Sequence, residues 1–182
     1  MRVTLCDTET GKIVSERYLR DTGTDERGNY IDGTISAPPG TYHLMAYNFD
    51  TESTHVQDKD NHFQMQVYTN PISEQLMDRL AFVRSSKDTK DWNIRYEPDH
   101  FFVETCEEIV VDDKPYADTL YNHQGDHFTA ESVVKTYYIQ VNVKGIEYIK
   151  SAYSLLTGMA GSVQLCDQSM VADPPASVFF HM

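Results

Sequence analysis

Cysteine, tryptophan and long apolar runs are scarce in this chain. Its 182 residues include three cysteines and one tryptophan. Cys6, Cys106 and Cys166 lie too far apart for the short ligand spacings of a metal site, and an odd, sparse set does not fit a disulfide framework. We expect three free, partly buried thiols that pack as small apolar groups.

Positive charge is also in short supply. The chain has 15 Lys and Arg against 28 Asp and Glu, a formal net charge of −13. It therefore lacks the clustered basic side chains that nucleic acids require, and it has little attraction for anionic lipids. No stretch approaches the ~18 apolar residues of a transmembrane helix. We expect an acidic, solubilising surface, no nucleic-acid partner and no transmembrane segment.

The clearest pattern in the sequence is an alternation of apolar and polar residues over residues 133–144. One face carries the apolar side chains Tyr137, Ile139, Val141 and Val143. Such alternation predicts a strand with one buried face and one solvated face. Gly145 follows and is expected at positive φ or in a tight turn. The small residues of 158–161 predict a break that packs where only small side chains fit.

Further short segments read as strands separated by turn residues. They span residues 2–7, 12–20, 29–36, 41–49, 63–68, 101–104, 107–112, 152–157, 161–166 and 176–181, with a loop at 21–28. This predicts an all-β, antiparallel Greek-key β-sandwich in two lobes, 1–97 and 98–182. Residues 70–90 hold at most one short helix, capped by Ser73. An irregular excursion across a sheet edge is the alternative there.

Possible metal ligands do not form a convincing site in the sequence. His123 and His127 flank a turn and would stand about 13 Å apart in a strand, at ~3.3 Å per residue. Two acidic loops are candidate calcium sites: Asp21, Asp25 and Asp32, and Asp58, Asp60 and His62. Neither has the ligand spacing of a calcium loop. We expect no metal and no cofactor.

Catalytic machinery is not evident either. Cys106 lies beside Glu107 and Glu108, and carboxylates raise the pKa of a neighbouring thiol. The pairs Glu107/Glu108 and Asp112/Asp113 are adjacent in predicted strands, so the two members point to opposite faces and cannot flank one sugar. We expect a protein without enzymatic activity.

Two motifs carry a family resemblance. Residues 39–52 read PGTYHLMAYNFDTE, and residues 154–161 read SLLTGMAG. In this order they resemble the fimbrillin-associated anchor lipoproteins of Bacteroidales, the FimB-like and Mfa-like fimbrial subunits. The resemblance implies transthyretin-like lobes and a lipoprotein exported to the outer membrane or cell surface. It also implies that the protein anchors, caps or assembles with fimbriae and has no catalytic residues.

Both ends of the chain fall inside predicted strands, at 2–7 and 176–181. We therefore expect truncated lobes, with the leader and the anchoring cysteine of a lipoprotein outside this sequence. An edge that has lost its neighbour invites pairing with another strand. The expected interface residues are Val3, Leu5, Val178 and Phe180. Other fimbrial subunits are the expected partners, and the truncated chain is expected to self-associate.

The alternative function is carbohydrate binding by a surface lipoprotein. Aromatic rings in polar loops can stack on sugars or anchor an interface. The candidate rings are Tyr116, Tyr121, Phe128 and Trp92. Burial of these rings against the sandwich is the competing interpretation, and for Trp92 we favour burial at the lobe boundary.

Overall fold

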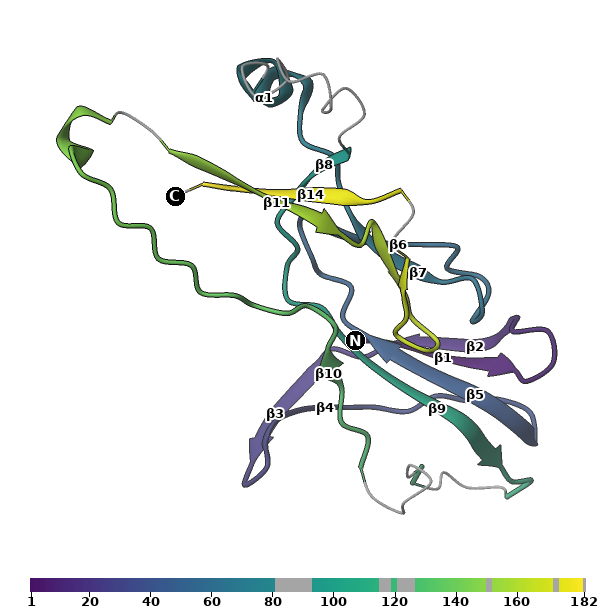
Figure 1. The fold of residues 1–182 in the computed structure, drawn as a ribbon. Coiled ribbons are helices and arrows are strands. Elements are labelled where there is room, and N and C mark those ends of the chain that lie inside the picture. The colour runs from purple at the N-terminus through teal and green to yellow at the C-terminus, as the bar shows by residue number, and fades with distance from the viewer. Residues whose placement is uncertain (81–92, 115–118, 121–126, 150–151, 172–173, 182) are drawn as a thin grey trace.

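The computed structural model describes residues 1–80, 93–114, 119–120, 127–149, 152–171 and 174–181. Strands dominate this part of the chain, with a single α-helix, α1 (Glu74–Arg79), and one short 3₁₀ helix, η3 (Ile146–Tyr148). Figure 1 shows the strands gathered into several sheets, with α1 set at one end. The all-β prediction with one short helix is confirmed, and Ser73 caps that helix by accepting a hydrogen bond from the Leu76 N–H.

The largest sheet has five strands in the order β10-β9-β5-β1-β2, and every neighbouring pair in it is antiparallel. Its strands are β1 (Arg2–Asp7), β2 (Ile13–Tyr18), β5 (Gly40–Tyr47), β9 (Phe102–Val111) and β10 (Glu131–Ser132). The two strands predicted at 101–104 and 107–112 are one continuous strand, β9.

Three smaller sheets complete the described fold. One contains β13 (Met170–Val171), β12 (Ser162–Gln164), β7 (Gln66–Thr69) and β6 (Thr54–Gln57); another contains β11 (Tyr153–Met159), β14 (Ala176–His181) and β8 (Asn93–Tyr96); and β3 (Asp21–Asp25) pairs with β4 (Gly28–Asp32). The β14–β8 pair is parallel, against the antiparallel prediction. Part of the loop predicted at 21–28 is therefore strand, because β3 and β4 form a hairpin.

The core follows from the alternation of side chains along β5. Met45 and Tyr47 point into a cluster shared with the four-stranded sheet, where Met65 and Val67 are also buried. Leu44 points the other way, into a second cluster behind the five-stranded sheet. Burying both faces of one sheet gives the sandwich its thickness. A third, smaller cluster joins α1 to the three-stranded sheet.

The strand pairing does not divide at residue 97, where the sequence predicts the lobe boundary. β9 lies beyond that residue but pairs along the full length of β5. In the other direction, β7 pairs with β12 and β8 pairs with β14. Strands from either side of the predicted boundary therefore share three sheets. The division into lobes 1–97 and 98–182 stays a prediction.

Of two glycine predictions, the one for Gly145 is confirmed, and the one for the break at 158–161 holds at Gly161 but not at Gly158. A Cβ at Gly158 would meet no atom within 4 Å, and Gly158 lies inside β11 with a φ of +74°. Gly145 has a φ of +79°, in the left-handed region that favours glycine. A Cβ at Gly161 would lie 2.8 Å from the carbonyl oxygen of Pro174, so only glycine fits there without a shift of the backbone.

Asp99 ties the start of β6 to the segment that leads into β9. Its Oδ2 accepts hydrogen bonds from the N–H groups of Ser53 (2.7 Å) and Thr54 (2.9 Å), and its own N–H donates to Thr54 Oγ1 at 2.8 Å. Burial alone raises the pKa of Asp99, but the hydrogen bonds from Thr54 and Ser53 outweigh it and hold that pKa below its usual value. One carboxylate therefore joins two sheets.

Replacing this carboxylate should destabilise the fold. In Asp99→Ala the N–H of Thr54, a residue only 2% exposed, loses its acceptor. We expect a loss of about 1–3 kcal/mol in the free energy of unfolding, measured by urea denaturation. The control is Asp113→Ala, at an exposed position, which should change it by less than about 0.5 kcal/mol. Equal losses in the two variants would contradict the bridging role of Asp99.

Candidate assembly surface

The feature that sets this fold apart is an extended segment without a partner strand, residues 135–144. The sheet ends just before it: Val133 donates its N–H to Phe101 O at 3.0 Å, and Val134 donates to Ser132 Oγ. From 135 to 144 no backbone–backbone hydrogen bond joins the segment to any other described residue. In Figure 1 it runs away from the sheets as a long, open stretch that ends at η3.

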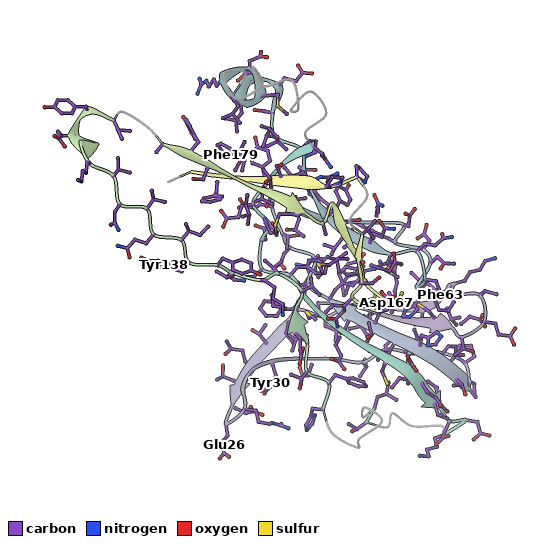
Figure 2. The ribbon with its side chains drawn as sticks, viewed as in Figure 1. Glu26, Tyr30, Phe63, Tyr138, Asp167 and Phe179 are labelled. Atoms are coloured by element: carbon purple, nitrogen blue, oxygen red, sulfur yellow. The ribbon has the colours of Figure 1, made fainter. Side chains whose placement is uncertain are left out.

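The predicted strand at 133–144 is therefore correct in its extended conformation but wrong in having a buried face. Its large apolar side chains are exposed by 43% to 93%: Tyr137 68%, Tyr138 93%, Ile139 50%, Val141 51% and Val143 43%. Figure 2 shows the side chains of this segment standing clear of the rest of the protein, with Tyr138 labelled. A continuous apolar row of this kind marks an interaction site.

Residue types explain why the segment stays extended. Val141, Val143 and Ile139 are β-branched, and the two tyrosines are aromatic; both classes favour strand over helix. Unpaired N–H and C=O groups along such a backbone are ready to pair with another strand. The segment also carries two lysines, Lys135 and Lys144, and no acidic residue, although the whole chain is strongly acidic.

Apolar exposure continues past the turn at Gly145. Tyr148, in η3, is 87% exposed, Ile149 is 45% exposed and Tyr153, the first residue of β11, is 42% exposed. β11 is itself an outer strand, because β14 is its one neighbour in the described part of the chain. We call residues 135–144, with their unpaired backbone and exposed apolar row, the open edge.

The strand edges predicted from the chain ends are closed. β1, which carries Val3 and Leu5, lies between β5 and β2, and Leu5 is 1% exposed. β14, which carries Val178 and Phe180, lies between β11 and β8. The backbones of both strands are already paired on both sides, so the premise of a free edge is wrong for them. A role for these four side chains in contacting a partner stays a prediction.

The structure describes one of the four candidate loop aromatics, Phe128. Phe128 is half-buried and packs against the second core cluster, as the burial interpretation expects. Tyr116, Tyr121 and Trp92 lie outside the described residues, as does His123. No placed ring therefore favours sugar binding through these loops.

The acidic residues considered as calcium ligands have other contacts in the fold. Asp25 forms an ion pair with Arg27 at 2.9 Å, and Asp21 and Asp32 face each other across the β3–β4 hairpin. Within the described ranges, no group of three or more His, Cys, Asp or Glu side chains is arranged to hold a metal ion.

The predicted thiol state is confirmed for all three cysteines. Cys6 and Cys106 are buried and Cys166 is half-buried, all without a disulfide. Burial raises the pKa of the Cys6 thiol, which disfavours a nucleophilic thiolate there.

Sequence reasoning missed a pair of stacked histidines. The rings of His43, on β5, and His62 lie 4.8 Å apart and nearly parallel, with Phe63 edge-on to both. The backbone N–H of His62 also donates to the backbone oxygen of Gly11 at 2.7 Å, so the loop before β7 is held against the β1–β2 turn. Burial lowers the pKa of His62 to about 4, with the neighbouring His43 adding to the effect. The two histidines are 19 positions apart, and no local pattern pairs them.

These features define an all-β protein with an open strand edge. Residues 15–181 match the family described as "Domain of unknown function (DUF5119)", and the chain belongs to that family. No helix in the described part is long and apolar enough to cross a membrane.

Two similar proteins come from Bacteroides ovatus. The curated relative "Putative fimbrium anchoring subunit Fim4B" is 24% identical over 128 residues, which is 70% of this chain and 33% of that protein. The crystal structure of "a putative adhesin" has a TM-score of 0.69 and 22% identity, covering 99% of this chain and 54% of that one. The chain thus spans about a third of the curated relative and about half of the solved structure. The predicted resemblance to Bacteroidales fimbrial anchor proteins is confirmed.

The histidine stack predicts a pH dependence of stability. The pKa of His62 is lowered in the fold from 6.5 to about 4. The stability that neutral His62 contributes is therefore fully present above pH 6.5 and is lost as the pH falls towards 4. The full loss is about 3 kcal/mol. His62→Phe keeps a flat ring in the stack and removes this titration. Between pH 7 and pH 4.5 its free energy of unfolding should therefore fall by about 2–3 kcal/mol less than that of the parent chain.

Urea unfolding at the two pH values measures this difference. The control His100→Phe, at an exposed ring, should follow the parent chain. If His62→Phe and the parent lose the same stability over this pH range, His62 is not neutral in the fold at low pH.

Proposed function

We propose that the protein is a non-catalytic fimbrial subunit of the cell surface that assembles by taking up a β-strand from another fimbrial subunit along residues 135–144. The observation that carries this proposal is an extended, alternating segment with an unpaired backbone and an exposed apolar row. The name of the curated relative, a fimbrium anchoring subunit, supports the same class of function.

Strand addition would stabilise this segment in two ways. An incoming strand would pair with its backbone N–H and C=O groups, each bond contributing about 1 kcal/mol net. It would also help to cover the face formed by Tyr137, Ile139, Val141 and Val143, where full burial of one such side chain contributes roughly 1.5–3 kcal/mol. Because the segment is already extended, less ordering free energy opposes binding.

Charge indicates the chemistry of the incoming strand. Lys135 and Lys144 bracket the segment, which has no acidic residue of its own. A partner strand with carboxylates at its two ends would meet these ammonium groups, whereas a strand with basic ends would be repelled. Self-pairing of two copies would bring lysines together, so a different subunit is the better partner.

Location follows from the same class. We place the protein at the cell surface, in the outer membrane, as a lipoprotein held through a lipid anchor, which its resemblance to fimbrial anchor proteins supports. The acidic surface is compatible with an exported protein that must stay dispersed before assembly.

A matched pair of double variants tests the proposal. Ile139→Lys with Val141→Lys places two charges on the apolar face, and Gln140→Lys with Asn142→Lys places the same charges on the polar face. We expect the first variant to bind fimbrial subunits from the same bacterium at least about tenfold more weakly, a difference of ~1.4 kcal/mol. The second should bind within about threefold of the parent.

Affinity is measured by native mass spectrometry or biolayer interferometry with purified subunits. Both variants should unfold at the parental urea concentration, because the segment packs on no described core cluster. Equal binding by the two variants, or no binding of the parent to any fimbrial subunit, would contradict strand addition at this segment.

A further inference from the structure

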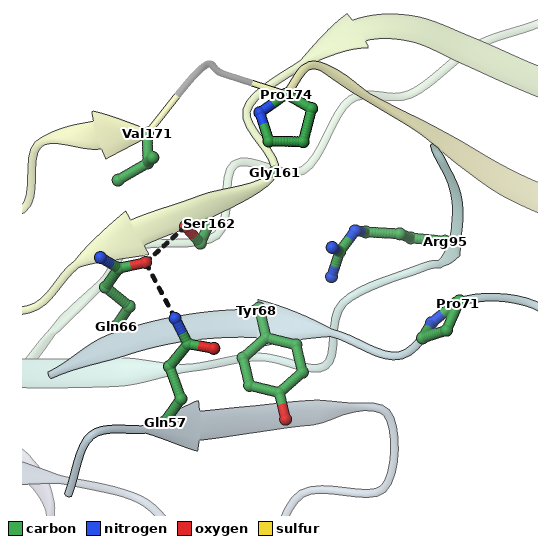
Figure 3. Close-up of a pocket in the computed structure, with 9 residues that line it drawn as sticks. All are labelled: Gln57, Gln66, Tyr68, Pro71, Arg95, Gly161, Ser162, Val171 and Pro174. Carbon is green, nitrogen blue, oxygen red and sulfur yellow. Dashed lines mark hydrogen bonds between the residues drawn. The ribbon is translucent and has the colours of Figure 1, made fainter. Parts of the chain in front are cut away.

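A cavity of about 370 Å³ opens on the surface where β7, β8 and β12 come together, and none of its described lining residues belongs to 135–144. This volume is at the lower end of the range for small-ligand sites, about 300–1,000 Å³. Its polar lining comes from four strands: Gln57 on β6, Gln66 and Tyr68 on β7, Arg95 on β8 and Ser162 on β12. Figure 3 shows these side chains facing a common space.

Arg95 provides a fixed positive charge at one wall. Its Nη1 donates to Thr69 O at 2.6 Å and its Nε donates to Asn93 Oδ1 at 3.1 Å. The guanidinium also lies 5.9 Å from the centre of the Tyr68 ring, a cation–π contact that holds it further. Within the described residues, no hydrogen bond is formed by its Nη2, and no carboxylate pairs with it.

The described lining of the cavity carries a positive charge and no negative charge. The net charge is −13, yet the cavity-lining residues that the structure describes include no Asp or Glu. Arg2, Arg27 and Lys114, by contrast, each form an ion pair with a carboxylate. A guanidinium with a free donor edge in a partly enclosed site is suited to an anionic group on a ligand.

The opposite wall is a chain of neutral hydrogen-bonding groups. Gln66 Oε1 accepts from Gln57 Nε2 at 3.1 Å and from Ser162 Oγ at 3.0 Å, as the dashed lines in Figure 3 show. This fixes the orientation of the Gln66 amide and leaves its Nε2 donors and the Gln57 Oε1 acceptor without a partner in the described residues. Adjacent donors and acceptors of this type are suited to hydroxyl groups.

Two further residues shape the site. Gly161 lies just before β12, and a Cβ there would lie 2.8 Å from the carbonyl oxygen of Pro174. The Tyr68 ring stands between the Arg95 wall and the glutamine wall (Figure 3) and can offer an apolar surface to C–H groups.

We propose that this cavity binds an acidic saccharide, with the carboxylate of a uronic acid on Arg95 and the ring hydroxyls on Gln57, Gln66 and Ser162. One or two sugar units match the size of the site. The strand-accepting segment contributes nothing to the cavity lining, so this inference is independent of the proposed assembly function. It also differs from sugar binding through loop aromatics, because the described polar lining comes from β6, β7, β8 and β12 and the described lining does not include Phe128.

The test compares glucuronate with glucose, which has the same ring without the carboxylate. Binding to the full chain is measured by saturation-transfer NMR and by isothermal titration calorimetry. We expect glucuronate to bind with a Kd on the order of 1 mM and glucose at least about ten times more weakly. No binding of glucuronate, or equal binding of both sugars, would overturn the proposal.

Variants assign the binding to this cavity. Arg95→Gln should weaken glucuronate binding at least about tenfold, while Arg27→Gln, at an exposed ion pair elsewhere, should leave it unchanged. Because Arg95 also bonds to Thr69 O, Gln57→Ala serves as a second variant that leaves the Arg95 bonds intact, and it should weaken binding severalfold. Parental affinity in both Arg95→Gln and Gln57→Ala would show that glucuronate binds elsewhere and would overturn the assignment.

Discussion

The pairing of β5 with β1 on one side and β9 on the other is the constraint on which the rest of the structure depends. It brings together three strands that lie far apart in the sequence, and it pairs the backbone of β5 on both sides over most of its length. Because successive β5 side chains point to opposite faces, Leu44 and Met45 each anchor a different core cluster. The chain then leaves this sheet through β9 and β10, so the segment that follows begins from a rigid support.

Residues 135–144 have the same alternation as β5 without a neighbour on either side among the described residues. An unpaired strand with an apolar face is unfavourable in water unless another chain completes it. A fimbrial subunit has a use for such a segment, since assembly requires a site that stays open until the partner arrives. The DUF5119 family match and the similarity to a fimbrium anchoring subunit are consistent with this use.

Local pattern predicted much of the fold, and nonlocal pairing accounts for what it missed. Strands β1, β5 and β14 lie close to their predicted ranges, and Gly145 has the expected positive φ. Alternation showed that 135–144 would be extended, but it cannot show whether a neighbour is present. For the same reason the sequence predicts open edges at β1 and β14, although each lies inside a sheet.

The sequence does not predict either of the two side-chain sites. The stack of His43 and His62 and the cavity around Arg95 both combine residues from strands and loops that are far apart along the chain. No spacing rule joins Gln57 to Ser162, because only the sheet order places β12 next to β7.

Amide hydrogen exchange over residues 135–144 tests the central claim most directly. In the isolated chain these amides should exchange nearly as fast as in an unfolded peptide, while the amides of β5 stay protected. On addition of a fimbrial subunit, protection should rise along the segment and remain unchanged in β1 and β5. Strong protection of 135–144 in the isolated chain, or none after a subunit has bound, would contradict strand addition at this site.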